Sequence, residues 1–171
     1  VDDIVHAISI LISKGYFVNL LAFSGKREEI LNKSVAKRVN SIMCLCVLHE
    51  GNAENILHAL KNSNLVIAMR FHALVLSMHY GTPVYSIAYS EKTEDLCRRL
   101  GLSNYCQKVC FSRSEYYSKI LQLDSTLLLN GIASIEKMNK MEKSKISEKF
   151  NEIQEQLDCD ISEFIASLFP E

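Results

Sequence analysis

The stretch that decides the fold is LVIAMRFHALVLSMHYGTPVYSIA, residues 65–88. It begins with a short apolar run at 65–69, continues through a largely apolar helix predicted at 71–80, and ends in a second apolar run at 84–88. Gly81-Thr82-Pro83 separates the helix from the second run, as expected where a helix must stop. A strand, a helix and a strand in this order predict a right-handed crossover between two parallel strands.

Apolar runs and helical periodicity alternate along the chain on both sides of this stretch. Further strands are predicted at 16–23, 42–48 and 109–111, and further helices at 2–14, 28–39, 53–61 and 93–100. Near-continuous apolar runs of this kind are typical of strands that are covered on both faces. We therefore predict an α/β fold, with a Rossmann-like parallel sheet and helices on both of its faces.

The pattern from residue 114 onward is helical only. Gly131 is expected to interrupt a first helical segment, and apolar residues then recur at steps of three and four between Ile146 and Leu168. Lysines and glutamates are interleaved over 136–149, which is typical of a solvated helix face with ion pairs. The sequence thus divides into an α/β unit at 1–113 and a C-terminal helical segment at 114–171.

Composition and charge narrow the class of protein. The chain has 171 residues, of which 48% are hydrophobic and 23% charged, and its net charge is -1. These values suit one globular domain, or two small ones at most, and exclude a disordered or fibrous chain. The balanced charge gives no drive toward nonspecific binding of nucleic acid. No apolar run approaches the ~18 residues that cross a bilayer, and the acidic N-terminus is unlike a signal peptide, so we expect a cytoplasmic protein.

The six cysteines, at positions 44, 46, 97, 106, 110 and 159, are expected to be free thiols. A chain with an apolar core of this size does not need disulfides. The cysteine spacings lack the two-residue separation of zinc knuckles, so no metal site is predicted. The chain has no initiator methionine and opens directly on a helical pattern, which indicates a piece of a longer protein.

The carboxyl ends of parallel strands are where such a sheet binds ligands, beside helix N-termini that favour anions. Four stretches fall there: Ser24-Gly25-Lys26, His49-Glu50-Gly51, Arg70-Phe71-His72 and Tyr89-Ser90-Glu91-Lys92. Arg70 follows an apolar run, and a guanidinium in that place needs an anionic partner. That partner is either a bound ligand or an acidic side chain from a neighbouring loop, and the residues alone leave both open.

His72 and Lys92 are further candidates at these strand ends. His72 lies in the predicted first helical turn after Arg70, where it could act as an acid or base, although a single histidine is more often a satisfied polar residue. Lys92 could hold a phosphate or carboxylate as a point charge, or could be an exposed lysine at a helix start. Ser90 is predicted as the N-cap of that helix. The motifs of dinucleotide binding, P-loops, serine hydrolases and zincins are all absent.

Residues 62–102 resemble the C-terminal half of polysaccharide pyruvyl transferases. In that family a strand ends in an Arg-x-His-Ala turn and an apolar helix closes on Gly-x-Pro. A further strand then ends in a Tyr, with a Lys three residues later before a helix that ends in Leu-Gly. The matching positions here are Arg70, His72, Ala73, Gly81, Pro83, Tyr89, Lys92, Leu100 and Gly101. The sequence departs from the family at Ser90-Glu91, where members often have Asp-Pro, and this leaves the shape of that loop open.

The resemblance implies a fold similar to the GT-B glycosyltransferases, in which two Rossmann-like domains face a cleft. This chain would be the C-terminal domain, with 1–113 as the donor-binding unit and 114–171 packed on it or on an N-terminal domain outside the sequence. The implied reaction transfers an enolpyruvyl unit from phosphoenolpyruvate to a sugar of a surface or cell-wall polysaccharide. Within it, Arg70 and Lys92 would bind the donor, Tyr89 and Ser24 would add donor contacts, and His72 would be the catalytic acid or base.

Two other functions stay open on the sequence. A GT-B-like glycosyltransferase with a nucleotide-sugar donor would need an acidic residue for the ribose hydroxyls, and Glu91 or Glu94 could supply it. A non-catalytic binding or scaffold domain would keep the same fold without activity. The apolar stripe at 146–168 would pack on the core or on the other domain, or would form a homodimer interface.

Overall fold

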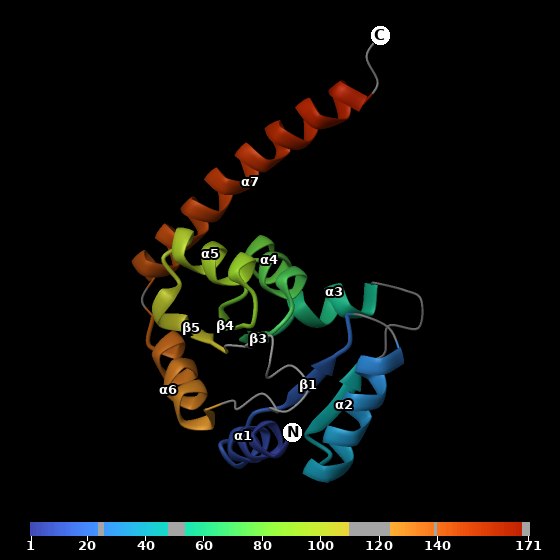
Figure 1. Ribbon diagram of the computed structural model, residues 1–171. Helices are drawn as coiled ribbons and strands as arrows, with labels where there is room; N and C mark the ends of the chain where they lie inside the picture. The colour runs from blue at the N-terminus through green and yellow to red at the C-terminus, as the bar shows by residue number, and fades with distance from the viewer. Residues whose placement is uncertain (24–25, 48–53, 110–123, 139, 169–171) are drawn as a thin grey trace.

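The computed structural model describes residues 1–23, 26–47, 54–109, 124–138 and 140–168, with side chains described up to Gln156. Helices and strands alternate through most of this range (Figure 1). The elements in chain order are α1 (Asp2–Ser13), β1 (Val18–Leu21), α2 (Lys26–Val39), β2 (Cys44–Val47), α3 (Glu54–Lys61), β3 (Val66–Ala68), α4 (Phe71–His79), β4 (Val84–Ala88), α5 (Glu91–Arg99), a 3-10 turn η1 (Ser103–Tyr105), β5 (Cys106–Lys108), α6 (Ser125–Glu136) and α7 (Lys140–Leu168).

All strand pairs in the described residues are parallel. β1 pairs with β2, and β4 lies between β3 and β5 in a three-stranded sheet. This arrangement confirms the predicted Rossmann-like α/β fold. The backbone hydrogen bonds divide the described strands into two sheets where the sequence predicted one. Apolar side chains join them instead, because Leu21 and Val47 pack on the same cluster as β3 and β4.

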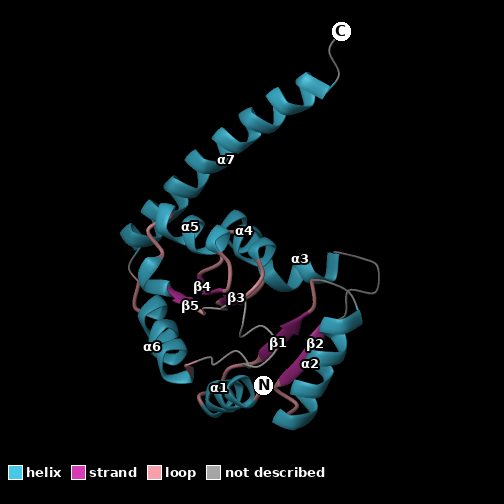
Figure 2. Ribbon diagram, viewed as in Figure 1, coloured by secondary structure: helices cyan, strands magenta, loops and turns pink. Residues whose placement is uncertain are grey.

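The three-stranded sheet is covered by helices on both faces (Figure 2). Every residue of β4 is buried, and its side chains alternate between two clusters as strand geometry requires. Val84 faces a cluster built by α3, α4 and α5, whereas Tyr85 and Ile87 face a cluster built by α1 and α6. The two faces together hold the apolar core that positions the strand ends.

The fifth strand lies at Cys106–Lys108, earlier than the predicted 109–111. Its pairing with β4 runs from Ser86 opposite Cys106 to Ala88 opposite Lys108. The middle residue of the strand, Gln107, is buried although it is polar, so a search for apolar runs misses it. Residues 110 and 111 lie outside the described part of the chain.

Gly131 does not interrupt its helix, contrary to the prediction. It lies inside α6, which begins after Asp124, an N-cap whose carboxylate accepts hydrogen bonds from the backbone N–H of Thr126 and Leu127. A Cβ atom at Gly131 would lie 1.9 Å from Cε2 of Tyr85. Glycine is therefore placed there by the close approach of α6 to β4 and not by a break in the helix.

Helix α7 starts against the α/β unit and then extends away from it (Figure 1). Phe150 is 6% exposed and belongs to the same cluster as α4 and α5, with Ile146 and Ile153 packed beside it. The cation of Lys149 lies near Gly101, at the end of α5. The described helices include none that is long and apolar enough to cross a membrane.

Candidate functional site

Arg70 stands at the junction between β3 and α4. Its backbone is extended, with φ -89° and ψ 138°, and it is the N-cap residue of α4. The Arg70 carbonyl accepts the backbone hydrogen bond of Leu74 at 3.1 Å, which opens the helix. The guanidinium therefore projects from the carboxyl end of β3, beside a helix N-terminus.

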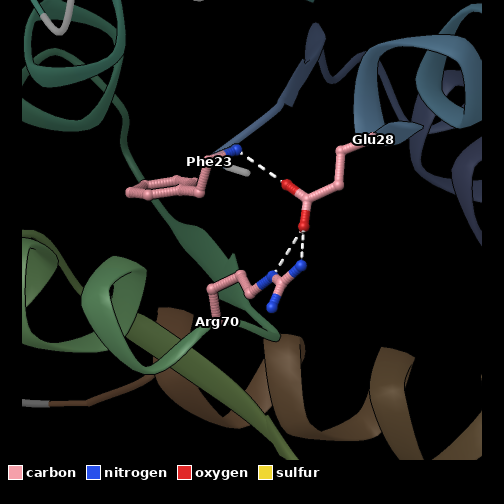
Figure 3. A network of polar contacts seen from close by, with 3 residues as sticks. All are labelled: Phe23, Glu28 and Arg70. Atoms are coloured by element: carbon pink, nitrogen blue, oxygen red, sulfur yellow. Dashed lines mark hydrogen bonds and ion pairs between the residues drawn. The ribbon is translucent and has the colours of Figure 1, made fainter. Parts of the chain in front are cut away.

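The guanidinium of Arg70 is paired with Glu28 (Figure 3). Nε of Arg70 donates to Oε1 of Glu28 at 2.6 Å, and Nη2 donates to the same oxygen. The other carboxylate oxygen, Oε2, accepts the backbone N–H of Phe23 at 2.8 Å. Glu28 thus binds two residues, Phe23 and Arg70, each of which lies two positions after the end of a strand, β1 and β3 respectively.

The ion pair with Glu28 affects the pKa and the orientation of the Arg70 guanidinium. The hydrogen bond that Arg70 donates to Glu28 raises the pKa of Arg70 above its usual value, so the guanidinium is cationic at neutral pH. The Arg70 side chain keeps 44% of its surface exposed, whereas Glu28 keeps 21%. The charge is fixed in place and still reaches solvent.

The sequence predicted that Arg70 needs an anionic partner, but it did not identify Glu28. The partner comes from the first turn of a helix and not from a loop. The sequence contains one signal for this partner, because Glu28 closely follows the strand predicted at 16–23. The carboxyl end of that strand lies near the carboxyl end of β3, where Arg70 is (Figure 3). Glutamates in first helical turns are common, so this signal alone selects no residue.

Lys92 and His72 meet on the ring of Phe71. Nζ of Lys92 lies over that ring, 4.0 Å from its centroid, in a cation–π contact. The His72 ring lies edge-on to the same ring, with the centroids 6.2 Å apart. Both side chains are exposed, and Phe71 is half-buried. Phe71, which was not predicted as a site residue, therefore contacts two residues that were, His72 and Lys92.

Tyr89 and Ser90 form the end of β4 and the start of α5. The Tyr89 side chain is hydrogen-bonded to Arg70 and is 36% exposed. Ser90 is the N-cap of α5 as predicted, since its hydroxyl accepts the backbone N–H of Thr93 at 3.4 Å. This cap sets the first turn of the helix, from which Lys92 projects.

The described contacts thus bring most of the predicted residues to one edge of the three-stranded sheet. Arg70 and Tyr89 touch each other, and Lys92 and His72 share Phe71. Ser24, predicted as a donor contact, lies outside the described residues, as does His49. No group of three or more histidine, cysteine or acidic side chains able to hold a metal ion occurs in the part of the chain that the structure describes.

A shallow groove of about 580 Å³ runs from this edge along α5 toward β5. Lys92 lines one part of it and Lys108 another, together with Glu91, Glu94 and Asp95. Lys108 and Glu94 are ion-paired at 2.7 Å. The groove therefore carries charges of both signs and is continuous with the residues around Phe71 through Lys92.

Comparison with known proteins assigns the family of this chain. The family model described as polysaccharide pyruvyl transferase matches residues 2–91, which is more than half of the sequence. The match includes Glu28, Arg70, His72 and Tyr89 and ends one residue before Lys92. Searches of curated proteins and of solved structures gave no match. With this match and a parallel Rossmann-like fold, the chain belongs to the polysaccharide pyruvyl transferase family.

Proposed function

We propose that this chain binds phosphoenolpyruvate and takes part in the transfer of its pyruvyl group to a sugar of a surface or cell-wall polysaccharide. The observation that carries the proposal is the position of Arg70: an oriented, charged guanidinium at a helix N-terminus and at the carboxyl end of β3. Membership of the family supplies the class of reaction.

The charges at this edge suit the donor. Phosphoenolpyruvate carries a phosphate and a carboxylate, and arginine binds either group through parallel N–H donors. Nε and Nη2 of Arg70 are engaged by Glu28, and the third nitrogen faces away from that carboxylate (Figure 3). A donor anion would bind this outer edge of the guanidinium, with Lys92 and the N-termini of α4 and α5 adding positive potential.

The chemistry needs a group that moves protons. A sugar hydroxyl adds to C2 of the enol phosphate and C3 takes up a proton to become a methyl group. A second sugar hydroxyl then adds to C2, and phosphate leaves as the ketal closes. His72 is proposed as the acid or base for one of these transfers, because it is exposed beside Phe71 and lies two residues after the Arg70 cap. Tyr89 would complete the donor contacts through its hydrogen bond to Arg70.

Calorimetric titration of phosphoenolpyruvate into the chain tests the proposal. We expect saturable binding that weakens by roughly tenfold or more in Arg70→Ala, the size of one lost charge-assisted hydrogen bond. The matched control is Arg99→Ala, at the opposite end of α5, which should leave the affinity unchanged. Equal binding by wild type and Arg70→Ala would contradict the assignment of Arg70.

Titrations with other ligands separate the alternatives. Pyruvate and inorganic phosphate, each with only part of the donor charge, should bind more weakly than phosphoenolpyruvate. Selective binding of uridine diphosphate would favour a nucleotide-sugar glycosyltransferase. The pairing of Glu94 with Lys108 gives that alternative no specific support, since it occupies one of the two acidic residues that could meet a ribose. Absence of binding by every ligand would favour a scaffold role.

A further inference from the structure

Two thiols that the proposed function does not use lie between α5 and β5. Cys97 lies on α5 and is 1% exposed, whereas Cys106 is the first residue of β5 and is half-buried. Cys106 packs against the cluster that contains Cys97, and each of the two thiols is the largest influence on the pKa of the other. Both line the groove along α5, so Cys106 can be reached from solvent.

The sheet brings the two thiols together. Cys106 pairs in register with Ser86 of β4, and Ser86 points to the face of the sheet that α5 covers. The Ser86 hydroxyl is buried and has no hydrogen-bond partner of normal geometry among the described residues, although it lies against both sulfur atoms. Each thiol thus has the other as a close neighbour, in a groove whose other lining residues are mostly charged.

The two sulfurs differ strongly in acidity. The hydrogen bond from Cys97 lowers the pKa of Cys106 to about 7, and the same bond raises the pKa of Cys97. Charged groups that line the groove around the pair come from both elements: Glu91, Lys92, Glu94, Asp95 and Arg98 from α5, and Lys108 from β5. Of these, Glu94 opposes ionisation of Cys106 and is itself paired with Lys108.

From this geometry we propose that Cys97 and Cys106 form an oxidation site, in which Cys106 reacts with a peroxide and Cys97 resolves the product as a disulfide between α5 and β5. The Cys106 thiolate attacks one peroxide oxygen, the O–O bond breaks, and water leaves to give a sulfenic acid. The sulfur of Cys97 then attacks the Cys106 sulfur, and the S–O bond breaks with loss of a second water. The two thiols lose two electrons and the peroxide takes them up.

Cys44 and Cys46 of β2 provide a matched internal control. Cys44 is buried like Cys97, and Cys46 is half-buried like Cys106. Burial raises the pKa of both Cys44 and Cys46, so neither is activated. A difference between the two pairs therefore reports the contact of Cys97 with Cys106 and not exposure alone.

The first test is peptide mapping after treatment with hydrogen peroxide, in a variant with Cys110→Ser and Cys159→Ser. Trypsin separates the two thiols onto different peptides, 93–98 and 100–108, so their disulfide has a diagnostic mass. We expect this cross-linked species, and we expect Cys44 and Cys46 to stay reduced. Peroxide treatment that oxidises Cys44 or Cys46 as readily as Cys106, or that yields no linked peptide, would overturn the proposal.

A second test does not depend on disulfide formation. Iodoacetamide at pH 7 should label Cys106 roughly tenfold faster than Cys46, because about half of a thiol with a pKa near 7 is ionised there and only a few per cent of an ordinary one is. In Cys97→Ser, oxidised Cys106 should persist as a sulfenic acid that dimedone traps. Equal labelling of Cys106 and Cys46 in the wild-type chain would contradict the proposal even if the variant failed to fold.

Discussion

The carboxylate of Glu28 joins two strand ends that backbone hydrogen bonds do not join. It accepts the N–H of Phe23 after β1 and the guanidinium of Arg70 after β3, and these strands belong to different described sheets. Glu28→Ala should lower the free energy of unfolding by about 1–2 kcal/mol, because a partly buried acceptor is lost and the ion pair is partly screened by solvent. Urea denaturation with an unchanged m-value measures this loss.

The control for this prediction is Glu29→Ala, in the same first turn of α2. It should change stability by less than about 0.5 kcal/mol, as expected for a residue away from a specific contact. Equal losses in the two variants would mean that Glu28 acts through the helix dipole alone and not through Phe23 and Arg70.

Arg70 and Glu28 also show how far the sequence goes at the scale of a residue. The need for an anion beside Arg70 follows from the apolar run before it, because an unpaired guanidinium there is costly. The identity of that anion does not follow from the sequence, since the two residues are 42 positions apart and meet only when the fold brings the segments after β1 and β3 together. Phe71 was not predicted as a site residue, because an apolar residue at the start of a helix is usually part of the core.

Among the elements, α6 is the one whose contacts with the sheet reverse a sequence prediction. Glycine lowers helix stability by roughly 1 kcal/mol relative to alanine, so Gly131→Ala would ordinarily stabilise a helix. The Tyr85 ring occupies the space that the new methyl group needs. We therefore expect Gly131→Ala to destabilise the protein by about 1–3 kcal/mol through overpacking, measured by thermal or urea unfolding.

A double-mutant cycle with Tyr85→Leu distinguishes overpacking from other causes. The smaller side chain vacates the ring space, so the two substitutions together should cost less than the sum of their separate effects. Asn130→Ala, at an exposed position next to Gly131 in the helix, serves as the control for helix propensity. Additive effects in the cycle would show that the Tyr85 contact does not decide the residue at 131.

Strands β4 and β5 show how well the hydrophobic pattern of the sequence predicts the position of a strand. β4 was predicted at its observed position because all five of its residues are buried and its apolar run stands between clear turn signals. β5 was displaced because Gln107, its central residue, is polar yet buried. The position of β5 is set by its pairing with β4, and the hydrophobic pattern of the sequence carries no information about that pairing.

At the scale of the molecule as a whole, the packing of Phe150 predicts that the C-terminal helix α7 and the sheet unfold together as one cooperative unit. Phe150 of α7 is 6% exposed in the cluster that also holds Leu74 and Leu100. Removing a buried phenylalanine side chain costs about 3–5 kcal/mol, so Phe150→Ala should lower the stability of the entire chain by roughly that amount. Met141→Ala, at a position 63% exposed on the same helix, should cost less than about 0.5 kcal/mol.

The form of the unfolding curve carries as much information as its midpoint. If α7 and the sheet unfold together, Phe150→Ala should shift a single transition that far-UV circular dichroism and tyrosine fluorescence both report. Separate transitions, with the sheet unchanged by Phe150→Ala, would mean that α7 adds no stability to the strand ends that carry Arg70 and Lys92. The contacts of Phe150 with the cluster shared by α4 and α5 favour the single transition, because those two helices begin at these same strand ends.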